Sequence, residues 1–141
     1  MKKTAAAKAN KNEKILLYCM DDARFEMVSV AIKKLHIEVL QADERALGKK
    51  VGALFGMRGF SDSSVEVQPA FHREAAVFYN IKNKRLDAVL SGLKEENIIL
   101  KYKAVTTPFN IHWTLAKLFD TMYKEHAYLV EKGADGVHHD E

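Results

Sequence analysis

The sequence predicts a mixed α/β (α+β) protein in which two successive βαβα-like halves share one four-stranded sheet. Three observations predict it. Two short apolar runs, residues 15–20 and 75–79, are typical of strands buried on both faces. Each run is followed by apolar residues at helical spacing and then by a second, more alternating strand. The order of these segments repeats along the chain with a period of about 61–64 residues.

The first half is expected over residues 14–57. Residues 15–20 form its buried strand, and Asp21 follows as a candidate helix cap. The helix is marked by an apolar stripe, Phe25, Val28, Ile32 and Leu35. A short strand over 39–42 and one or two helical turns over 51–55 complete this half. Residues 56–73, which contain glycine, serine, aspartate and proline, are typical of a connecting loop.

The second half is expected over residues 74–132 and repeats this order. After the strand at 75–79 comes a helix with the apolar stripe Leu86, Val89, Leu90 and Leu93. A strand over 98–105 precedes the long last helix, whose apolar positions are Ile111, Leu115, Leu118, Phe119, Met122 and Leu129. Gly133 is expected to end that helix. Outside this single domain, residues 1–13 are predicted to be a disordered basic leader and residues 133–141 a flexible tail.

The two unbroken apolar strands are expected at the centre of the sheet, and the two alternating strands at its edges. Two pairings fit this arrangement. One is a ferredoxin-like split βαβ pairing with extra helices, and the other is a doubly wound parallel sheet. We favour the first because it needs only four strands. The repeated order also suggests that the chain arose by duplication.

Composition limits the kinds of partner. The net charge is +3, and the four lysines and one glutamate of residues 1–13 account for all of it. A neutral folded body lacks the electrostatic footprint of a nucleic-acid-binding protein. The single cysteine cannot form an internal disulfide, which indicates a reducing compartment. No apolar stretch approaches the roughly 20 residues of a membrane span. We therefore expect a cytoplasmic protein that binds neither nucleic acid nor membrane.

The sequence contains no pattern typical of catalysis or of metal binding. Cys19 ends the first strand, but the aspartates beside it oppose thiolate formation, so we predict a small core residue. His112 and His126 are 14 residues apart on one predicted helix, about 21 Å, too far to hold one metal ion. The glycines between residues 52 and 59 lack the spacing of a phosphate-binding loop. We therefore predict no catalytic residue, no metal and no cofactor.

The junction at residues 103–113 is the best candidate for a ligand site. It joins a predicted strand to the predicted start of the last helix, where Pro108 suits the first turn. Free amide groups at a helix start attract a carboxylate or phosphate. The candidate ligand-binding residues are Lys103, Thr107, Asn110 and Trp113. A structural interpretation competes with this one, because Thr107 and Asn110 are also good helix caps and Trp113 could pack on the sheet.

The last helix is a candidate interface between two copies of the chain. Its apolar stripe is expected to cover the sheet. Phe119, Tyr123, Tyr128 and Val130 widen its apolar surface beyond one narrow face. Part of this surface could therefore pack against a second copy, giving a homodimer.

The second half resembles a known family. The run Lys103-Ala104-Val105, then Thr107-Pro108, Asn110 and Trp113, followed by Leu118 and Glu125-His126, resembles the bacterial domain-of-unknown-function family 3783. The resemblance covers about residues 74–127, and the first half agrees only in general layout, including Leu47-Gly48. It implies a compact bacterial domain and names no reaction, cofactor or partner.

The sequence thus supports a non-catalytic binding or protein-interaction module as the leading hypothesis. The alternative is a small-molecule domain that binds an anionic metabolite at residues 107–113. An enzyme that uses Cys19 is the third and weakest hypothesis.

Overall fold

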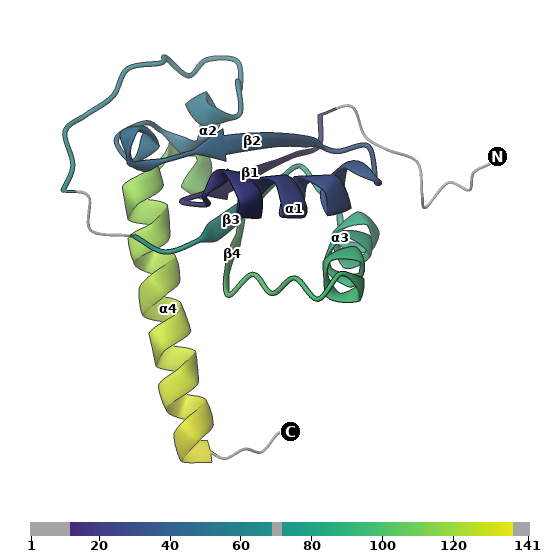
Figure 1. Ribbon diagram of the computed structural model, residues 1–141. Helices are drawn as coiled ribbons and strands as arrows, with labels where there is room; N and C mark the ends of the chain where they lie inside the picture. The colour runs from purple at the N-terminus through teal and green to yellow at the C-terminus, as the bar shows by residue number, and fades with distance from the viewer. Residues whose placement is uncertain (1–11, 69–71, 137–141) are drawn as a thin grey trace.

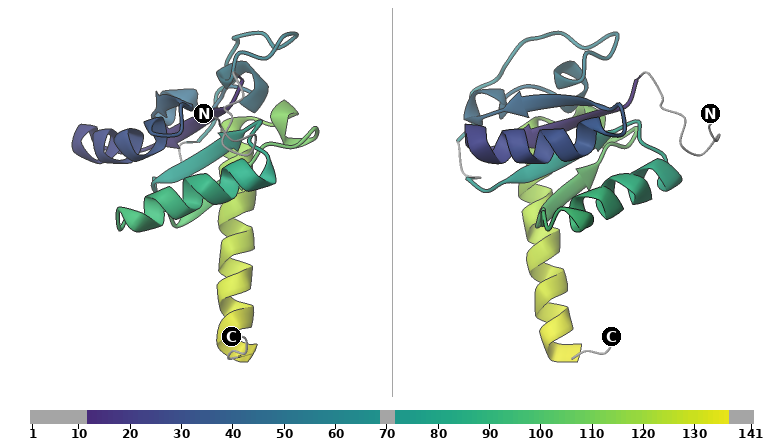
Figure 2. Two further views of the ribbon diagram at one scale, coloured as in Figure 1. Left: turned by 90° about the vertical axis from the view of Figure 1, so that its right-hand side faces the viewer. Right: turned by 45° about the vertical axis from the view of Figure 1, so that its right-hand side comes forward.

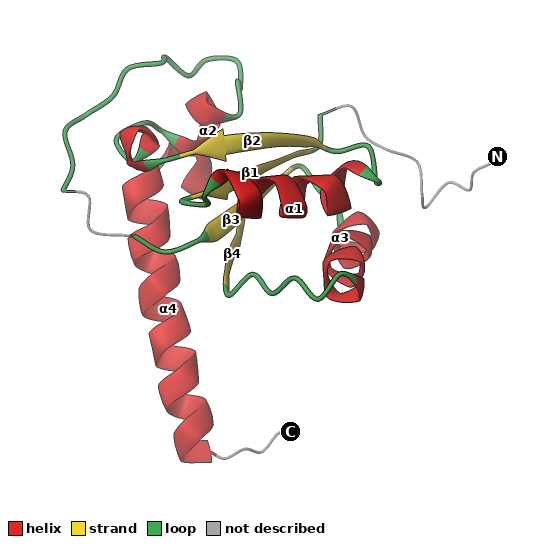
Figure 3. Ribbon diagram, in the orientation of Figure 1, coloured by secondary structure: helices red, strands yellow, loops and turns green. Residues whose placement is uncertain are grey.

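The computed structural model describes residues 12–68 and 72–136, in which helices cover both faces of one four-stranded sheet (Figures 1 and 3). In chain order the elements are β1 (Lys14–Tyr18), α1 (Asp22–Lys33), β2 (Glu38–Ala42), the 3₁₀ turn η2 (Glu44–Ala46), α2 (Val51–Leu54), β3 (Ala75–Tyr79), α3 (Asn83–Glu95), β4 (Tyr102–Val105), the 3₁₀ turn η3 (Asn110–His112) and α4 (Leu115–Gly136). The predicted fold class, two βαβα-like halves sharing one sheet, is confirmed.

The strands lie in the order β2-β1-β3-β4, so the two apolar strands are central, as predicted. Within each half the strands are parallel, whereas β1 and β3 are antiparallel, with Leu16 opposite Val77. The favoured split βαβ pairing is therefore wrong, because β1 bonds directly to β2 with no strand between them. A wholly parallel sheet is wrong as well. A strand that is apolar on both faces shows the same pattern whatever its neighbour or direction, so the sequence could not decide the pairing.

The core has two layers, one on each face of the sheet. Alternate residues of β1 and β3 point into each layer, which explains why both strands are apolar throughout. Helices α1 and α3 cover one face, where Ile15, Leu17, Val28, Ile32, Phe78, Val89 and Leu93 are buried together. Helices α2 and α4 cover the other face, where Leu16, Tyr18, Val51, Phe55, Val77, Leu115 and Phe119 are buried together.

The bounds of two elements in the second half, β4 and α4, differ from the expectation. β4 begins at Tyr102 rather than at residue 98, because Tyr102 pairs with Ala75, the first residue of β3. Ile98 and Leu100 are nevertheless buried in the core below α3. The last helix continues past Gly133 to Gly136. A glycine costs a helix only about 1 kcal/mol, which is not enough to end it.

The loop that joins the halves packs closely on the residues that precede α2. The amide of Val65 donates to the carbonyl of Gly48 at 3.0 Å, and Lys49 Nζ contacts the Asp62 carboxylate at 2.8 Å. A Cβ atom at residue 48 would lie 1.9 Å from the Val65 carbonyl oxygen. Gly48 is therefore required by this close approach of two backbones.

The predicted leader and tail lie largely outside the described residues. Glu13, assigned to the leader, is instead buried in an ion pair with Arg85 of α3, with Oε1 and Nη2 2.8 Å apart. Residues 133–136, assigned to the tail, form the end of α4. The residues next to Glu13 do not indicate this ion pair, because its partner Arg85 is 72 positions away in the chain.

Candidate functional site

The predicted junction is a closed turn. The side chain of Asn110 is buried, and its Oδ1 accepts a hydrogen bond from the Thr107 amide at 2.8 Å. Its Nδ2 donates to the Val105 carbonyl at 3.1 Å, and the Asn110 amide donates to Thr107 Oγ1 at 3.0 Å. Both polar groups of the Asn110 side chain thus hold the backbone between β4 and η3. The predicted capping of a helix by Thr107 and Asn110 is wrong, because Phe109 precedes η3 without a side-chain cap and the two residues instead hold the turn before it.

The other two predicted ligand-binding residues lie apart from each other. Lys103 Nζ donates to the Leu100 carbonyl, and its side chain lines a groove on the α1/α3 face of the sheet. Trp113 packs on the opposite face, with Lys117 Nζ 4.7 Å from its ring centroid. The structure therefore brings Thr107 and Asn110 together but separates Lys103 from Trp113. The expected helix start at Pro108 is wrong, because α4 begins only at Leu115.

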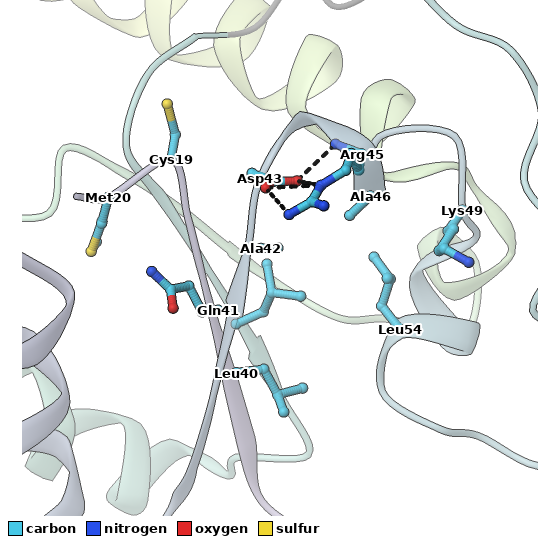
Figure 4. Close-up of a pocket in the computed structure, with 11 residues that line it drawn as sticks. Cys19, Met20, Leu40, Gln41, Ala42, Asp43, Arg45, Ala46, Lys49 and Leu54 are labelled. Carbon is cyan, nitrogen blue, oxygen red and sulfur yellow. Dashed lines mark hydrogen bonds and ion pairs between the residues drawn. The ribbon is translucent and has the colours of Figure 1, made fainter. Parts of the chain in front are cut away.

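A hollow of about 520 Å³ lies at the carboxyl ends of β1 and β2, and we call it the first hollow (Figure 4). This is the edge at which open α/β sheets bind their ligands. Its lining includes Cys19, Met20, Gln41, Asp43, Arg45 and Lys49. The Cys19 amide donates to the Ala42 carbonyl at 3.1 Å, so the ends of the two strands are held together.

The charged groups of the first hollow are already paired. Arg45 Nη2 lies 2.7 Å from Asp43 Oδ2, and this hydrogen-bonded pairing lowers the pKa of Asp43 and raises that of Arg45. Asp43 also accepts from the Arg45 amide at 2.9 Å and so caps η2. Lys49 is paired with Asp62. In the first hollow, the charges of Asp43, Arg45 and Lys49 are thus each compensated by an opposite charge, and much of the remaining lining is apolar. No sequence pattern indicated these residues, although Asp43 directly follows the predicted strand.

Cys19 is exposed at the edge of the first hollow, so its prediction as a core residue is wrong. β1 ends at Tyr18, and Cys19 has a left-handed backbone, with φ of 64°. Because of this left-handed turn, the Cys19 side chain does not continue the alternation between the two faces that the side chains of β1 follow. Partial burial, Glu44 and Glu74 all raise the pKa of the thiol. A thiol in this environment is not an activated nucleophile.

We expect Cys19 to react slowly. Because its pKa is raised, the thiolate fraction at pH 7 lies below that of free cysteine, and iodoacetamide should alkylate the folded protein more slowly than the protein in urea. Glu44→Gln removes one carboxylate that opposes ionisation, so it should increase the rate at pH 7. Folded protein that reacts faster than unfolded protein would restore the hypothesis of a cysteine enzyme.

A second hollow, of about 450 Å³, lies at the carboxyl ends of β3 and β4. Asn80, Ile81, Lys82, Thr106, Thr107 and Pro108 are among its lining residues. Thr107 is the one predicted ligand-binding residue that lines it. Within residues 12–68 and 72–136, no group of three or more histidine, cysteine, aspartate or glutamate side chains could hold a metal ion. None of the helices in this part of the chain is long and apolar enough to cross a membrane.

Comparison with known proteins identifies the second half. No curated protein and no solved structure matches the chain. A family model described as Domain of unknown function (DUF3783) matches residues 74–129. The matched segment contains β3, α3, β4, η3 and the part of α4 that packs on the sheet. The resemblance predicted from the junction motif is therefore confirmed, since residues 74–129 match the DUF3783 family model.

Proposed function

We propose that this protein is a non-catalytic interaction module of the bacterial cytoplasm that pairs with a second copy of itself through α4. The observation that carries the proposal is the course of this helix. Figures 1 and 2 show α4 leaving the body of the protein and extending well beyond the sheet. The cytoplasmic location rests on the single cysteine.

Only the first part of α4 is anchored. Leu115, Leu118, Phe119 and Met122 are buried against the sheet, and the His126 ring lies 4.9 Å from the Tyr102 ring. The helix then continues to Gly136, about 15 Å further. A helical segment of this length is marginal in water without a tertiary partner, and Gly133 weakens it further. The helical state of this last part of α4 is explained if another protein surface packs against it.

The exposed side of α4 suits a second copy in antiparallel orientation. Tyr123 is 38% exposed and Ala127 is exposed, and positions 130 and 134 continue this line at the spacing of four and three residues typical of a helix-pairing seam. In an antiparallel pair centred between 128 and 129, position 127 of one copy is opposite position 130 of the other, and position 123 is opposite position 134. The sequence then sets a large residue opposite a small one at each of these positions.

Charge favours the same orientation. Lys124 and Glu131 are seven residues apart and therefore lie on one side of the helix. Antiparallel pairing brings position 124, a lysine, near position 131 of the other copy, a glutamate. Parallel pairing brings position 124 near position 119, a phenylalanine, and therefore offers Lys124 no opposite charge. The second copy is therefore the occupant that the sequence of α4 fits best.

The proposal predicts a dimer that depends on this seam. Light scattering after gel filtration should give twice the monomer mass for the wild type, and Val130→Asp should give a monomer because it introduces a charge into the seam. Lys124→Glu should raise the dissociation constant, and adding Glu131→Lys should restore it. Lys33→Glu, at an exposed position of α1, is the control and should leave the dimer unchanged. A wild type that is monomeric at every concentration, or a dimer indifferent to Val130→Asp, contradicts the proposal.

The alternative function, binding of an anionic metabolite near Thr107, keeps one supporting observation. Thr107 lines the second hollow together with Lys82, at the start of α3. Inorganic phosphate should then raise the melting temperature of the wild type but not that of Lys82→Ala. No shift in the wild type contradicts this alternative.

A further inference from the structure

Two ion pairs connect the halves of the chain in a reciprocal way. Glu13, just before β1, pairs with Arg85 of α3 at 2.8 Å. Glu74, just before β3, pairs with Arg24 of α1 at 3.2 Å. The two glutamates are 61 residues apart, and so are the two arginines. Each half therefore gives a glutamate to the arginine of the other half. This is the rule of an interface between two copies of one unit, in which residue i contacts residue j and j contacts i.

The backbone repeats at the same spacing. Four residues other than glycine have a left-handed backbone, counted over the part of the chain that the structure describes: Cys19, His36, Asn80 and Asn97. They form two pairs, Cys19 with Asn80 and His36 with Asn97, each again 61 residues apart. Left-handed residues of this kind are uncommon, so two coincidences at one spacing are strong evidence of equivalent turns.

A second set of reciprocal contacts lies on the other face of the sheet. The Val51 amide donates to the Trp113 carbonyl at 2.9 Å, and the Leu115 amide donates to the Lys49 carbonyl at 2.9 Å. Val51 and Leu115 are 64 residues apart, and so are Lys49 and Trp113. The starts of α2 and α4 are thus equivalent and bind each other directly. The change in spacing from 61 to 64 falls between α1 and β2, whose equivalents α3 and β4 are joined by the longer connection.

We infer that residues 13–57 are a second, diverged copy of the unit that residues 74–129 form, and that each copy is the binding partner of the other. The antiparallel contact of β1 with β3, the two glutamate–arginine pairs and the contact of α2 with α4 form one two-fold interface. The surface of the DUF3783 unit that faces the first half is thus a self-association surface, occupied within this chain by the other copy. This inference is independent of the proposed dimer through α4.

The two hollows are equivalent under this symmetry and show where the copies have diverged. Cys19 and Met20 of the first hollow correspond to Asn80 and Ile81 of the second. Asp43 corresponds to Thr107. The interface contacts are retained in both copies, whereas the residues at the strand ends are not. Divergence at the strand ends is expected, because the loops there vary more readily than the elements that hold the fold together.

The experiment separates the copies without removing either. A protease recognition sequence is inserted after His72, an exposed residue, and the purified full chain is cleaved there. The cleaved protein should elute as the intact one does and should unfold in a single transition. Arg85→Gln should raise the dissociation constant of the two fragments about 100-fold or more, since it leaves Glu13 buried without its cation. Arg24→Gln, at the more exposed equivalent pair, should raise it about two- to fivefold.

The control is Arg45→Gln, which removes an ion pair within one copy and should leave the dissociation constant unchanged. Fragments that separate and unfold independently overturn the inference. It is also overturned if Arg45→Gln has an effect equal to that of Arg85→Gln, or if Arg24→Gln has no effect.

A second measurement on the intact chain tests the equivalence of the turns. Cys19→Asn should raise the melting temperature and Asn80→Cys should lower it, because asparagine tolerates the left-handed backbone better. Shifts of the same sign at both positions contradict it.

Discussion

Replacing Arg85 by alanine should lower the free energy of unfolding by about 3–5 kcal/mol, because it leaves the buried Glu13 carboxylate without its partner. Arg85 contacts both carboxylate oxygens of Glu13, at 2.8 and 3.0 Å, and also donates to the Leu35 carbonyl at 2.7 Å. The hydrogen bond with Glu13 raises the pKa of the guanidinium, so Arg85 stays charged. Urea denaturation of both proteins at pH 7 measures the difference.

The matched control is Arg24→Ala. This substitution removes the equivalent ion pair with Glu74, whose side chains are 25% and 40% exposed. Water already screens this pair, so the expected loss is only about 0–1 kcal/mol. The contrast between the two substitutions isolates the effect of burial. Equal losses at both positions would show that the Glu13–Arg85 pair gains nothing from its buried position.

Phe119→Ala should cost about 3–5 kcal/mol, the second large effect that we expect. Phe119 is fully buried where α4 packs on the sheet, and its ring centroid lies 4.7 Å from that of Tyr18. Truncation removes the contact between β1 and α4 and leaves a cavity between layers. Most small domains have a total stability of about 5–15 kcal/mol, so this single substitution removes a large part of it.

Tyr123→Ala is the control for Phe119→Ala, because it removes an aromatic ring from the same helix at a more exposed position. Because Tyr123 lies in the proposed seam, both variants are measured at a concentration at which the chain is monomeric. The expected loss is below about 1.5 kcal/mol. Thermal and urea unfolding of both variants measure the two losses. A loss at Phe119 no larger than at Tyr123 would mean that α4 is not anchored to the sheet by its buried stripe.

The elements of the protein could be predicted because each has a local pattern. The apolar runs that became β1 and β3, and the helical stripes that became α1 and α3, depend only on the spacing of residues along the chain. The start of α1 was also predictable, since the Asp21 carboxylate accepts from the Arg24 amide at 2.8 Å as a helix cap does. The start of β4 was less predictable from the sequence, because β4 extends only as far as its pairing with β3.

The candidate sites were only partly predictable. Thr107 and Asn110 meet in one turn because they are three residues apart. Lys103 and Trp113 are separated by the sheet, since successive strand residues alternate between faces and the chain then turns around one edge. Cys19 was wrongly placed in the core because the apolar run gave no sign of the left-handed turn that ends β1. The first hollow was missed because its residues come from two strands and a turn.

The sequence by itself determined the number of strands, which of them are central and the repeat of the halves, because each depends on the local spacing of residues. It also determined the family resemblance of residues 74–129, which depends on a short motif. Only the tertiary structure decided that β1 and β3 run antiparallel and that Glu13 and Glu74 cross to the opposite halves. The physical reason is that pairing direction and charge partners depend on contacts between residues 50 to 72 positions apart. Those contacts leave no periodicity in the chain, and they form only when the two halves bury their apolar strands against each other.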